Sequence, residues 1–261
     1  MPLLAFQGTA RPLSADGLSA VSGKLGVHAP ELWTVLAVET AGCGYLPDHR
    51  PQILYERHIF HRLTNGKYDD GDISDPIAGR YGPSGAHQYD RLALAIAKDR
   101  TAALQSCSWG IGQIMGENYA LAGFSDVEQM VAAMCESEDQ QLAAMGNFLL
   151  RSRLNIPLQT HDWASFARGY NGADYAINRY AIRLNAEFHK CCAGGLPDLN
   201  VRAVQLYLKY LHFHPGQVDG IAGSLTWSAL ADFQTQHRLP KTHTIDAETV
   251  AQLSAVNEET S

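Results

Sequence analysis

A short run of small and turn-forming residues, CCAGGLPDLN at 191–200, divides this 261-residue chain into two unequal parts. Gly194, Gly195 and Pro197 favour a connection there, because glycine and proline are the strongest local breakers of regular structure. The longer part is large enough to bury a hydrophobic core of its own, and the shorter part carries a separate pattern. We therefore expect a domain at 1–190, a linker at 191–197, a second domain at 198–256 and a disordered tail at 257–261.

The composition is that of an ordinary globular protein, and it argues against a nucleic-acid-binding protein and a membrane-spanning protein. Hydrophobic residues make up 46% of the chain and charged residues 18%, with a formal net charge of -7. That charge argues against a broad basic surface for nucleic acid. No apolar run reaches the roughly 18 residues that cross a bilayer, and the N-terminal segment lacks the features of a secretory signal. We expect no nucleic-acid partner, no membrane insertion and folding in the cytosol.

The cysteines and histidines do not form a disulfide framework or a metal site. The cysteines are odd in number and lack framework spacing, which predicts small buried thiols; they are Cys43, Cys107, Cys135, Cys191 and Cys192. His58 and His61 are three residues apart, without a third ligand at a spacing typical of zinc sites. The sequence therefore predicts no metal and no cofactor.

Helical periodicity dominates the longer part. Apolar residues recur at helical spacing in five stretches, which are 14–27, 30–40, 125–150, 162–172 and 173–188. Ser125 and Glu128 have the spacing of a capping box at the start of the third stretch. A Gly-, Pro- and Asp-rich segment at 65–90 lacks periodicity and predicts loops with short strands at most. The predicted fold is mainly α with a loop-rich insertion.

One acidic residue stands where a core residue belongs. Val35 and Leu36 face the expected core, and Glu39 lies on the same stripe one turn later, before Gly42 and Gly44 end the helix. Apolar surroundings and the negative C-terminal end of a helix both raise the pKa of a carboxyl group. A carboxyl kept protonated in this way is suited to general acid catalysis, the alternative being a purely structural hydrogen bond.

A second stretch, SCSWGIGQIMG at 106–116, offers several groups that could contact a polar ligand. Ser108 supplies a hydroxyl, Gln113 an amide, and Gly110 and Gly112 an uncovered backbone. Gly-rich turns are common, so this stretch is weak support when taken alone. It gains meaning from its position between Glu39 and a third motif.

The third motif, ARGYNG, places Tyr170 and Asn171 at the end of an amphipathic helix. In this order, the three motifs resemble those of the lysozyme-like glycosidase superfamily, particularly goose-type lysozymes and lytic transglycosylases. Longer segments, including AVETAGCGYLPDHRPQILYERHIFHRLT and ALQSCSWGIGQIMGENY, resemble the N-acetylmuramidase family of phage endolysins. The resemblance covers about residues 14–190. It implies a lysozyme-like α+β catalytic domain that hydrolyses the β-1,4 bond between N-acetylmuramic acid and N-acetylglucosamine.

The resemblance also implies roles for individual residues. Tyr170 would hydrogen-bond or orient Glu39. The groups expected to hold N-acetyl and hydroxyl groups of the sugars belong to Ser108, Gln113 and Asn171. Trp109 is either a stacking platform for a sugar ring or a buried aromatic residue.

A second catalytic carboxylate is less clearly marked. An inverting glycosidase needs a base about 6.5–9.5 Å from the acid, with a water between them. Glu56, in the apolar run ILYERHIF, either points into the cleft or pairs with a cation such as Arg57. An acidic loop offers other carboxylates, or is simply a solvated surface; they are Asp69, Asp70, Asp72 and Asp75. Inversion and transglycosylation both remain open.

The shorter part has a weak internal repeat, in which GQVDGIAGSLTWSAL and HTIDAETVAQL share a hydrophobic residue, an Asp, a spacer and a Thr. Asp219 and Gly220 are expected to form a turn, and the pattern predicts three short helices. The stretch VDGIAGSLTWSALADFQ resembles the small peptidoglycan-binding domain of wall hydrolases. We expect a tethered wall anchor whose removal, at 196–261, leaves cleavage of soluble glycan unchanged.

Taken together, these features favour a monomeric phage or prophage endolysin that acts on the peptidoglycan of the bacterial cell wall. It would stay in the host cytoplasm until holin-formed lesions release it to the wall. The alternatives are a lytic transglycosylase that forms 1,6-anhydro products, a non-catalytic wall-binding or virion protein, and a secreted antibacterial toxin. An amidase or peptidase with Cys43 or Cys107 as its nucleophile is disfavoured because neither thiol has a basic neighbour.

Overall fold

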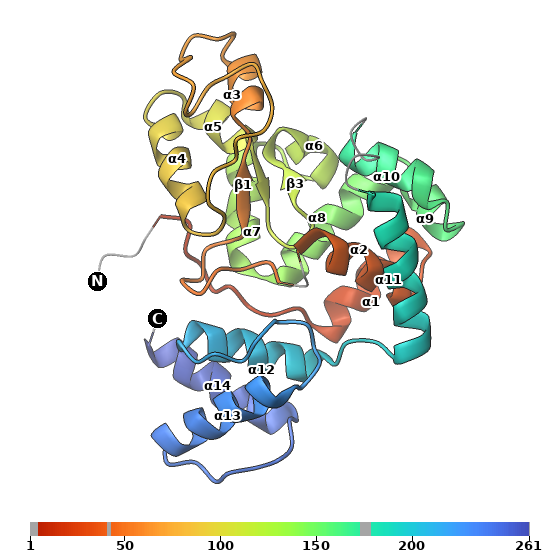
Figure 1. Cartoon of the computed structure of the whole chain (residues 1–261), viewed down its shortest axis with the longest axis vertical. Coiled ribbons are helices and arrows are strands. Elements are labelled where there is room, and N and C mark those ends of the chain that lie inside the picture. The colour runs from red at the N-terminus through yellow and green to blue at the C-terminus, as the bar shows by residue number, and fades with distance from the viewer. Residues whose placement is uncertain (1–4, 41–42, 173–178, 261) are drawn as a thin grey trace.

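The computed structural model describes residues 5–40, 43–172 and 179–260, which form a larger helical domain and a smaller three-helix domain below it (Figure 1). The helices of the larger domain are α1 (Ala15–Leu25), α2 (Ala29–Thr40), α3 (Arg57–Leu63), α4 (His87–Ile96), α5 (Arg100–Gln105), α6 (Tyr119–Ala122), α7 (Val127–Glu136), α8 (Glu138–Arg151), α9 (Asn155–Gln159), α10 (Trp163–Asn171) and α11 (Tyr180–Gly194). The smaller domain contains α12 (Leu199–Tyr210), α13 (Ser224–Gln236) and α14 (Ala247–Thr260).

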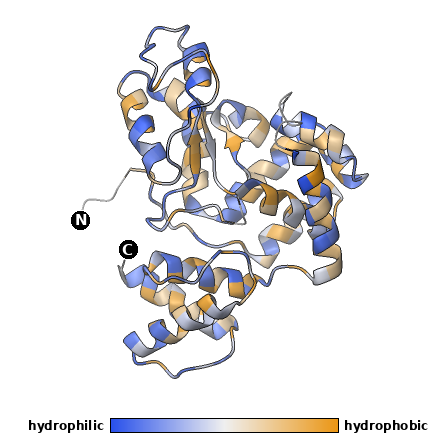
Figure 2. Cartoon of the chain, viewed as in Figure 1, coloured by the Kyte–Doolittle hydropathy of each residue, from blue (hydrophilic) through white to orange (hydrophobic). Residues whose placement is uncertain are grey.

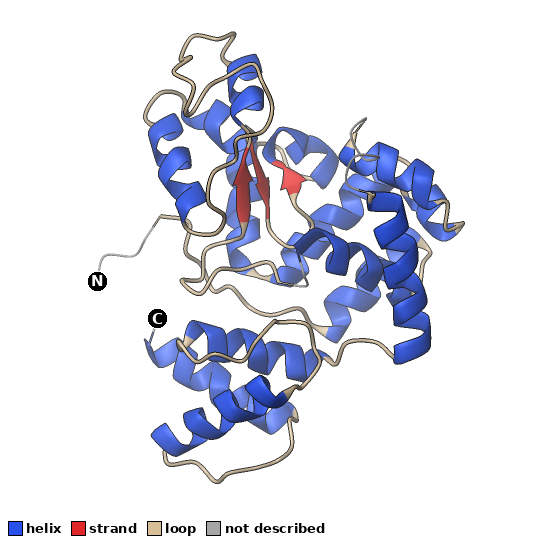
Figure 3. Ribbon diagram, in the orientation of Figure 1, coloured by secondary structure: helices blue, strands red, loops and turns tan. Residues whose placement is uncertain are grey.

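A small antiparallel sheet completes the larger domain (Figure 3). Its strands, in the order β1-β2-β3, are β1 (Ile53–Tyr55), β2 (Cys107–Trp109) and β3 (Ile114–Met115). Ser108 pairs with Leu54 on one side and with Met115 on the other. A 3-10 turn, Gly116–Asn118, follows β3. The mainly α fold with a small sheet and a helical second domain confirms the predicted fold class.

Helix α8 lies at the centre of the larger domain and packs against α1, α6 and α7. Leu142, Met145 and Leu149 on its inner face have no exposed surface, as the helical stripe predicts. Apolar residues gather where helices face one another, while polar residues cover the outside (Figure 2). Among the described helices, none has the length and hydrophobicity needed to cross a bilayer.

The single helix predicted for 125–150 is in fact two helices. Ser137 is extended and caps α8 through its hydroxyl, which accepts a hydrogen bond from the Gln140 amide. The N-terminal segment causes the break, because Arg11 forms a bridge with Ser137 and exchanges backbone hydrogen bonds with residues 136 and 138. The predicted capping box is also wrong, because Asp126 caps α7.

The smaller domain is built around one buried cluster and one tight turn. Val204, Leu230 and Phe233 lie in the cluster with at most 1% of their surface exposed. The Gln205 side-chain oxygen accepts hydrogen bonds from the backbone amides of Asp219 and Gly220. Gly220 has φ 76°, a left-handed conformation that suits glycine. The structure thus confirms the predicted turn at Asp219 and Gly220, which helps to hold the smaller domain together.

The linker and the tail differ from the prediction. Helix α11 continues to Gly194, so the first residues of the predicted linker form its last turn. Helix α14 continues to Thr260, and the Asn257 side chain is 5% exposed, so the expected disordered tail is helical over the described residues. Residues 173–178, predicted to begin the last helix of the larger domain, lie outside the described residues.

Candidate active site

Helix α2 delivers Glu39 to the interior of the larger domain. Val35 and Leu36 have no exposed surface and fix the helix against the core, while Glu39 one turn later is only partly buried. Burial raises the pKa of Glu39 from its ordinary value to about 7, against the opposing effects of a Tyr180 hydrogen bond, the Arg183 charge and an Asn171 hydrogen bond. Near neutral pH about half of these carboxyls therefore keep a proton that an ordinary glutamate has lost.

Helix α11 supplies the groups that surround this carboxyl, because it packs along α2. The Tyr180 hydroxyl donates a hydrogen bond to Glu39 Oε1. Arg183 Nη2 donates to the Val38 carbonyl at 3.0 Å, which places the guanidinium at the C-terminal end of α2. Burial and the nearby Glu39 raise the pKa of Tyr180, so its hydroxyl remains a donor.

The predicted role of Tyr170 is wrong. Its hydroxyl donates to the Gly112 carbonyl at 2.5 Å, and its ring stacks on Phe166 with centroids 5.4 Å apart. The tyrosine hydroxyl that donates a hydrogen bond to Glu39 is that of Tyr180. The neighbouring Asn171 forms a side-chain hydrogen bond with Glu39, and its predicted contact with the sugars stays a prediction. Tyr180 has a signal in the sequence, because it lies one turn before the buried Leu184 on the same helical face.

Ser108 and Gln113 lie together, but they bind each other. Ser108 Oγ donates to Gln113 Oε1 at 2.8 Å, and Gln113 Nε2 donates to the Gly110 carbonyl at 2.8 Å. Gln113 Nε2 also lies 3.3 Å from the Gln52 carbonyl. These contacts build the 110–113 turn. Gln113 is partly exposed, whereas Ser108 is buried.

The two glycines of this turn pack closely against helix α8. A Cβ atom on Gly110 would lie 2.6 Å from the Gln141 side chain, and one on Gly112 would lie 2.9 Å from Met145. Gly110 also has φ 69°. Both positions therefore require glycine because of close packing inside the protein.

Trp109 is a core residue. It has no exposed surface, and its indole Nε1 donates to the Leu104 carbonyl at 3.1 Å. The stacking-platform alternative is wrong, because no face of this ring is available to a sugar.

Glu56 follows β1 directly and is a second carboxyl with an altered pKa. Its side chain is 15% exposed, and burial raises its pKa to about 7, against a hydrogen bond from Tyr81. His58 Nδ1 lies 3.2 Å from Glu56 Oε2. The predicted alternative of an Arg57 partner is wrong, because Arg57 turns away to the Gly71 and Gly79 carbonyls.

The acidic loop closes on itself. The carboxylate of Asp69 contacts His61 and Ser74, and the carboxylate of Asp70 accepts hydrogen bonds from the backbone amides of Asp72 and Ile73. Asp75 lies 3.3 Å from the Arg57 guanidinium. These carboxylates order the loop, and among the described residues no cluster of side chains suited to a metal is found.

The 110–113 turn lies between the segments that carry Glu39 and Glu56, the two carboxyls with a raised pKa. Thr40 Oγ1, next to Glu39 at the end of α2, donates to the Ile111 carbonyl at 3.1 Å. Gln113 reaches the Gln52 carbonyl at the start of the strand that leads into Glu56. One short turn therefore contacts the helix end that carries Glu39 and the start of the strand whose far end leads into Glu56.

A model of the N-acetylmuramidase family matches residues 28–192. The chain belongs to this family. A peptidoglycan-binding domain model matches residues 197–253 of the chain. The crystal structure of the Burkholderia AP3 phage endolysin is 36% identical, covers 70% of this chain and 72% of that one, and superposes with a TM-score of 0.64. No curated protein matches the chain at a significant level. With both domains present, the protein is a peptidoglycan hydrolase.

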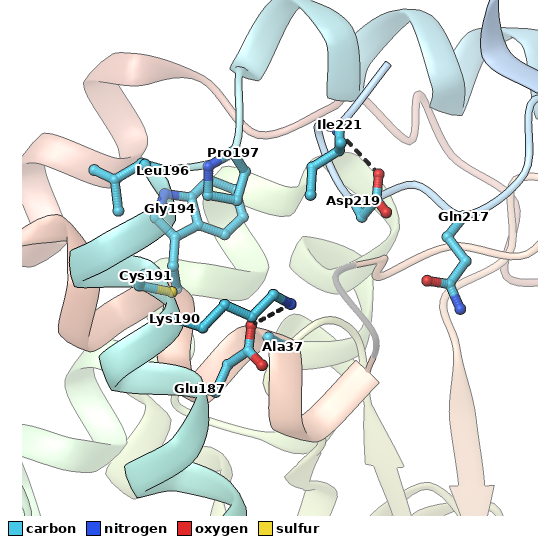
Figure 4. A pocket seen from close by; sticks show the side chains of 12 residues that line it. Ala37, Glu187, Lys190, Cys191, Gly194, Leu196, Pro197, Gln217, Asp219 and Ile221 are labelled. Atoms are coloured by element: carbon cyan, nitrogen blue, oxygen red, sulfur yellow. Dashed lines mark hydrogen bonds and ion pairs between the residues drawn. The ribbon is translucent and has the colours of Figure 1, made fainter. Parts of the chain in front are cut away.

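A cavity of about 320 Å³ lies where the two domains of the protein meet (Figure 4). Trp33 and Ala37 of α2, Lys190 of α11, and Gln217 and Asp219 of the smaller domain line it. Glu39 is not among the lining residues, so this cavity is separate from the candidate active site.

Proposed function

We propose that this protein cleaves the β-1,4 bond between N-acetylmuramic acid and N-acetylglucosamine, with Glu39 as the general acid. The observation that carries the proposal is the partly buried carboxyl at the end of α2 with a pKa of about 7. An oxocarbenium-like transition state needs a proton on the departing oxygen. At pH 7 about half of such carboxyls are protonated, against well under one in a hundred at an ordinary glutamate pKa.

The neighbours of Glu39 suit both stages of the proton transfer. Tyr180 and Asn171 hold the carboxyl in one orientation, which keeps its proton directed at the leaving group. Once the proton has left, the Arg183 charge and the same hydrogen bonds favour the carboxylate.

We also propose Glu56 as the base that activates water. Its carboxyl is mostly buried, has no ion pair with Arg57, and lies at the far end of the strand that the 110–113 turn connects to Glu39. Glu56→Gln is expected to lower kcat about a hundredfold, because a general base contributes factors of this order. The assay is release of reducing ends from soluble glycan. Glu128→Gln, which removes an exposed carboxylate paired with Arg100, is the control and should leave kcat unchanged.

Mass spectrometry of the digestion products tests the proposed reaction. Hydrolysis adds one water at each cut and leaves a reducing N-acetylmuramic acid. A 1,6-anhydro end would show a lytic transglycosylase, and intact glycan chains with released peptides would show an amidase. A Glu56→Gln variant with the wild-type rate, together with anhydro products, would replace hydrolysis by transglycosylation.

Tyr180→Phe tests the corrected assignment of the tyrosine. Because the Tyr180 hydrogen bond lowers the pKa of Glu39, its loss should move the alkaline limb of the pH–rate profile to higher pH, by about one unit. The loss of orientation should also lower kcat about tenfold. Tyr170→Phe is the matched control, because its hydroxyl binds Gly112. A limb that moves in Tyr170→Phe and stays in Tyr180→Phe would reverse the assignment.

A further inference from the structure

Helix α12 of the smaller domain binds the larger domain through one of its faces. Lys209 Nζ donates to the Tyr45 carbonyl at 2.9 Å, and the Tyr210 hydroxyl donates to the Ala10 carbonyl at 2.9 Å. Arg202, two turns earlier, lies on the same face. Ala10, Cys43 and Tyr45 share one buried cluster with residues of the smaller domain. The two domains are therefore packed together, and the smaller one is more than a tethered anchor.

A fully buried ion pair lies in this contact. Arg202 of α12 and Glu138 of α8 both have side chains with no exposed surface. Arg202 Nη2 donates to Glu138 Oε1 at 2.7 Å, and Nη1 donates to Oε2. The guanidinium also lies 6.0 Å from the ring of Trp33, on the helix that carries Glu39. Removing one partner of such a pair leaves the other charge buried and uncompensated.

The carboxylate of Glu138 holds two backbone amides besides Arg202. Oε1 accepts from Gly44 at 2.8 Å, and Oε2 accepts from Leu13 at 2.9 Å. Gly44 lies five residues after Glu39, and the amide of the adjacent Cys43 donates to the Thr40 carbonyl at the end of α2 at 3.4 Å. The pair therefore ties the smaller domain to the segment that follows the proposed general acid.

The next turn of α8 holds the other side of the same site. Gln141 Oε1 accepts from the Ile111 amide at 2.7 Å, and Thr40 donates to the Ile111 carbonyl. Glu138 and Gln141, one turn apart, thus fix both Gly44 and the 110–113 turn to α8, and Thr40 joins that turn to the end of α2. A shift of α8 or of the Glu138 carboxylate would be passed to the end of α2.

We propose that Arg202 is a positioning residue for the cleavage reaction: through Glu138 it fixes Gly44 and hence the end of α2, although it belongs to the wall-binding domain. This inference rests on the proposed function of Glu39. Without Arg202 the buried Glu138 carboxylate would be uncompensated and would turn towards water, and Gly44 would lose its partner. Displacing a catalytic group by about 1 Å costs roughly a hundredfold in rate.

Full-length Arg202→Met tests the proposal on a soluble glycan oligomer, for which wall anchoring is irrelevant. We expect kcat to fall about ten- to a hundredfold at a temperature well below melting, with KM changed less than about threefold. Arg238→Met, which removes an exposed charge from the same domain, should keep the wild-type kcat. Glu138→Gln combined with Arg202→Met removes the uncompensated charge and should restore part of the lost kcat.

Wild-type kcat in a folded Arg202→Met protein, with only melting temperature or wall binding lowered, would overturn the proposal. If Arg202→Met does not fold, Arg202→Lys gives the same readout, because it keeps the charge and loses the two-pronged contact. Failure of the proposed function looks different. In that case the wild type itself would not cleave the oligomer, or Glu39→Gln would cleave it as fast.

Discussion

Glu39→Gln is expected to lower the rate of peptidoglycan cleavage at least about a hundredfold, because glutamine is close in size to glutamate but has no proton to give to the leaving group. The amide oxygen can still accept the hydrogen bond from Tyr180, so the surroundings should persist. Loss of turbidity of purified cell walls and release of reducing ends measure the effect. A variant that keeps more than a few per cent of the wild-type rate would refute the general-acid role.

The stability of Glu39→Gln gives an independent control. Because the folded-state pKa of about 7 lies above the ordinary value of 4.5, the protonated carboxyl favours the folded state. This contribution is complete below about pH 4.5 and is lost as pH rises through about 7. Above pH 7 the ionised carboxyl costs at most about 3 kcal/mol, less because the group is partly exposed. The variant should match the wild type at pH 4.5 and exceed it in unfolding free energy at pH 8.

Glu138→Leu is expected to be strongly destabilising, by about 3–5 kcal/mol, because it leaves the buried Arg202 guanidinium without this carboxylate. It also removes the acceptor of the Gly44 and Leu13 amides. Chemical denaturation at neutral pH measures the loss as a lower unfolding midpoint.

Two further variants separate the loss of the buried ion pair from the general effect of replacing a carboxylate by leucine. Glu136→Leu changes an exposed carboxylate two residues earlier and should shift the unfolding free energy by less than about 1 kcal/mol. Glu138→Leu with Arg202→Met replaces both charges by apolar groups and should recover much of the loss. A single variant as stable as the wild type would show that the ion pair does not hold the domains together.

Much of the fold could be predicted from the apolar faces of the helices. The helical periodicity of apolar residues along 30–40 places Glu39 on the inner face at the end of α2, because helical spacing alone determines the direction of a side chain. The same spacing predicts the buried face of α8, although Ser137 divides the long helix. That division depends on a backbone pairing with Arg11, which lies far away in the sequence. Local periodicity contains no information on such a pairing.

The site itself could be predicted only in part, because its contacts join distant segments. Tyr170 and Tyr180 are both tyrosines near Asn171, and only the packing of α11 along α2 decides which hydroxyl reaches Glu39. Glycines 110 and 112 suggested an approach for glycan, whereas α8 is what lies against them.

The relation between the domains was the larger error of prediction. The Gly- and Pro-containing connection indicated an independent anchor, and removal of 196–261 was expected to leave soluble-glycan cleavage unchanged. The role proposed for Arg202 alters that expectation, because the removed part contains this residue. A charged residue on the inner face of α12 was a visible signal, but its partner lies 64 residues earlier. The pairing therefore appears only in the folded chain.

The most direct test of the account is a titration of the Glu39 carboxyl by ¹³C NMR in the full-length protein, with Glu39→Gln identifying its signal. The account predicts an apparent pKa of about 7, set by burial between α2 and α11. A titration near the ordinary value of 4.5 would contradict it, because the carboxyl would then have no proton to donate at neutral pH.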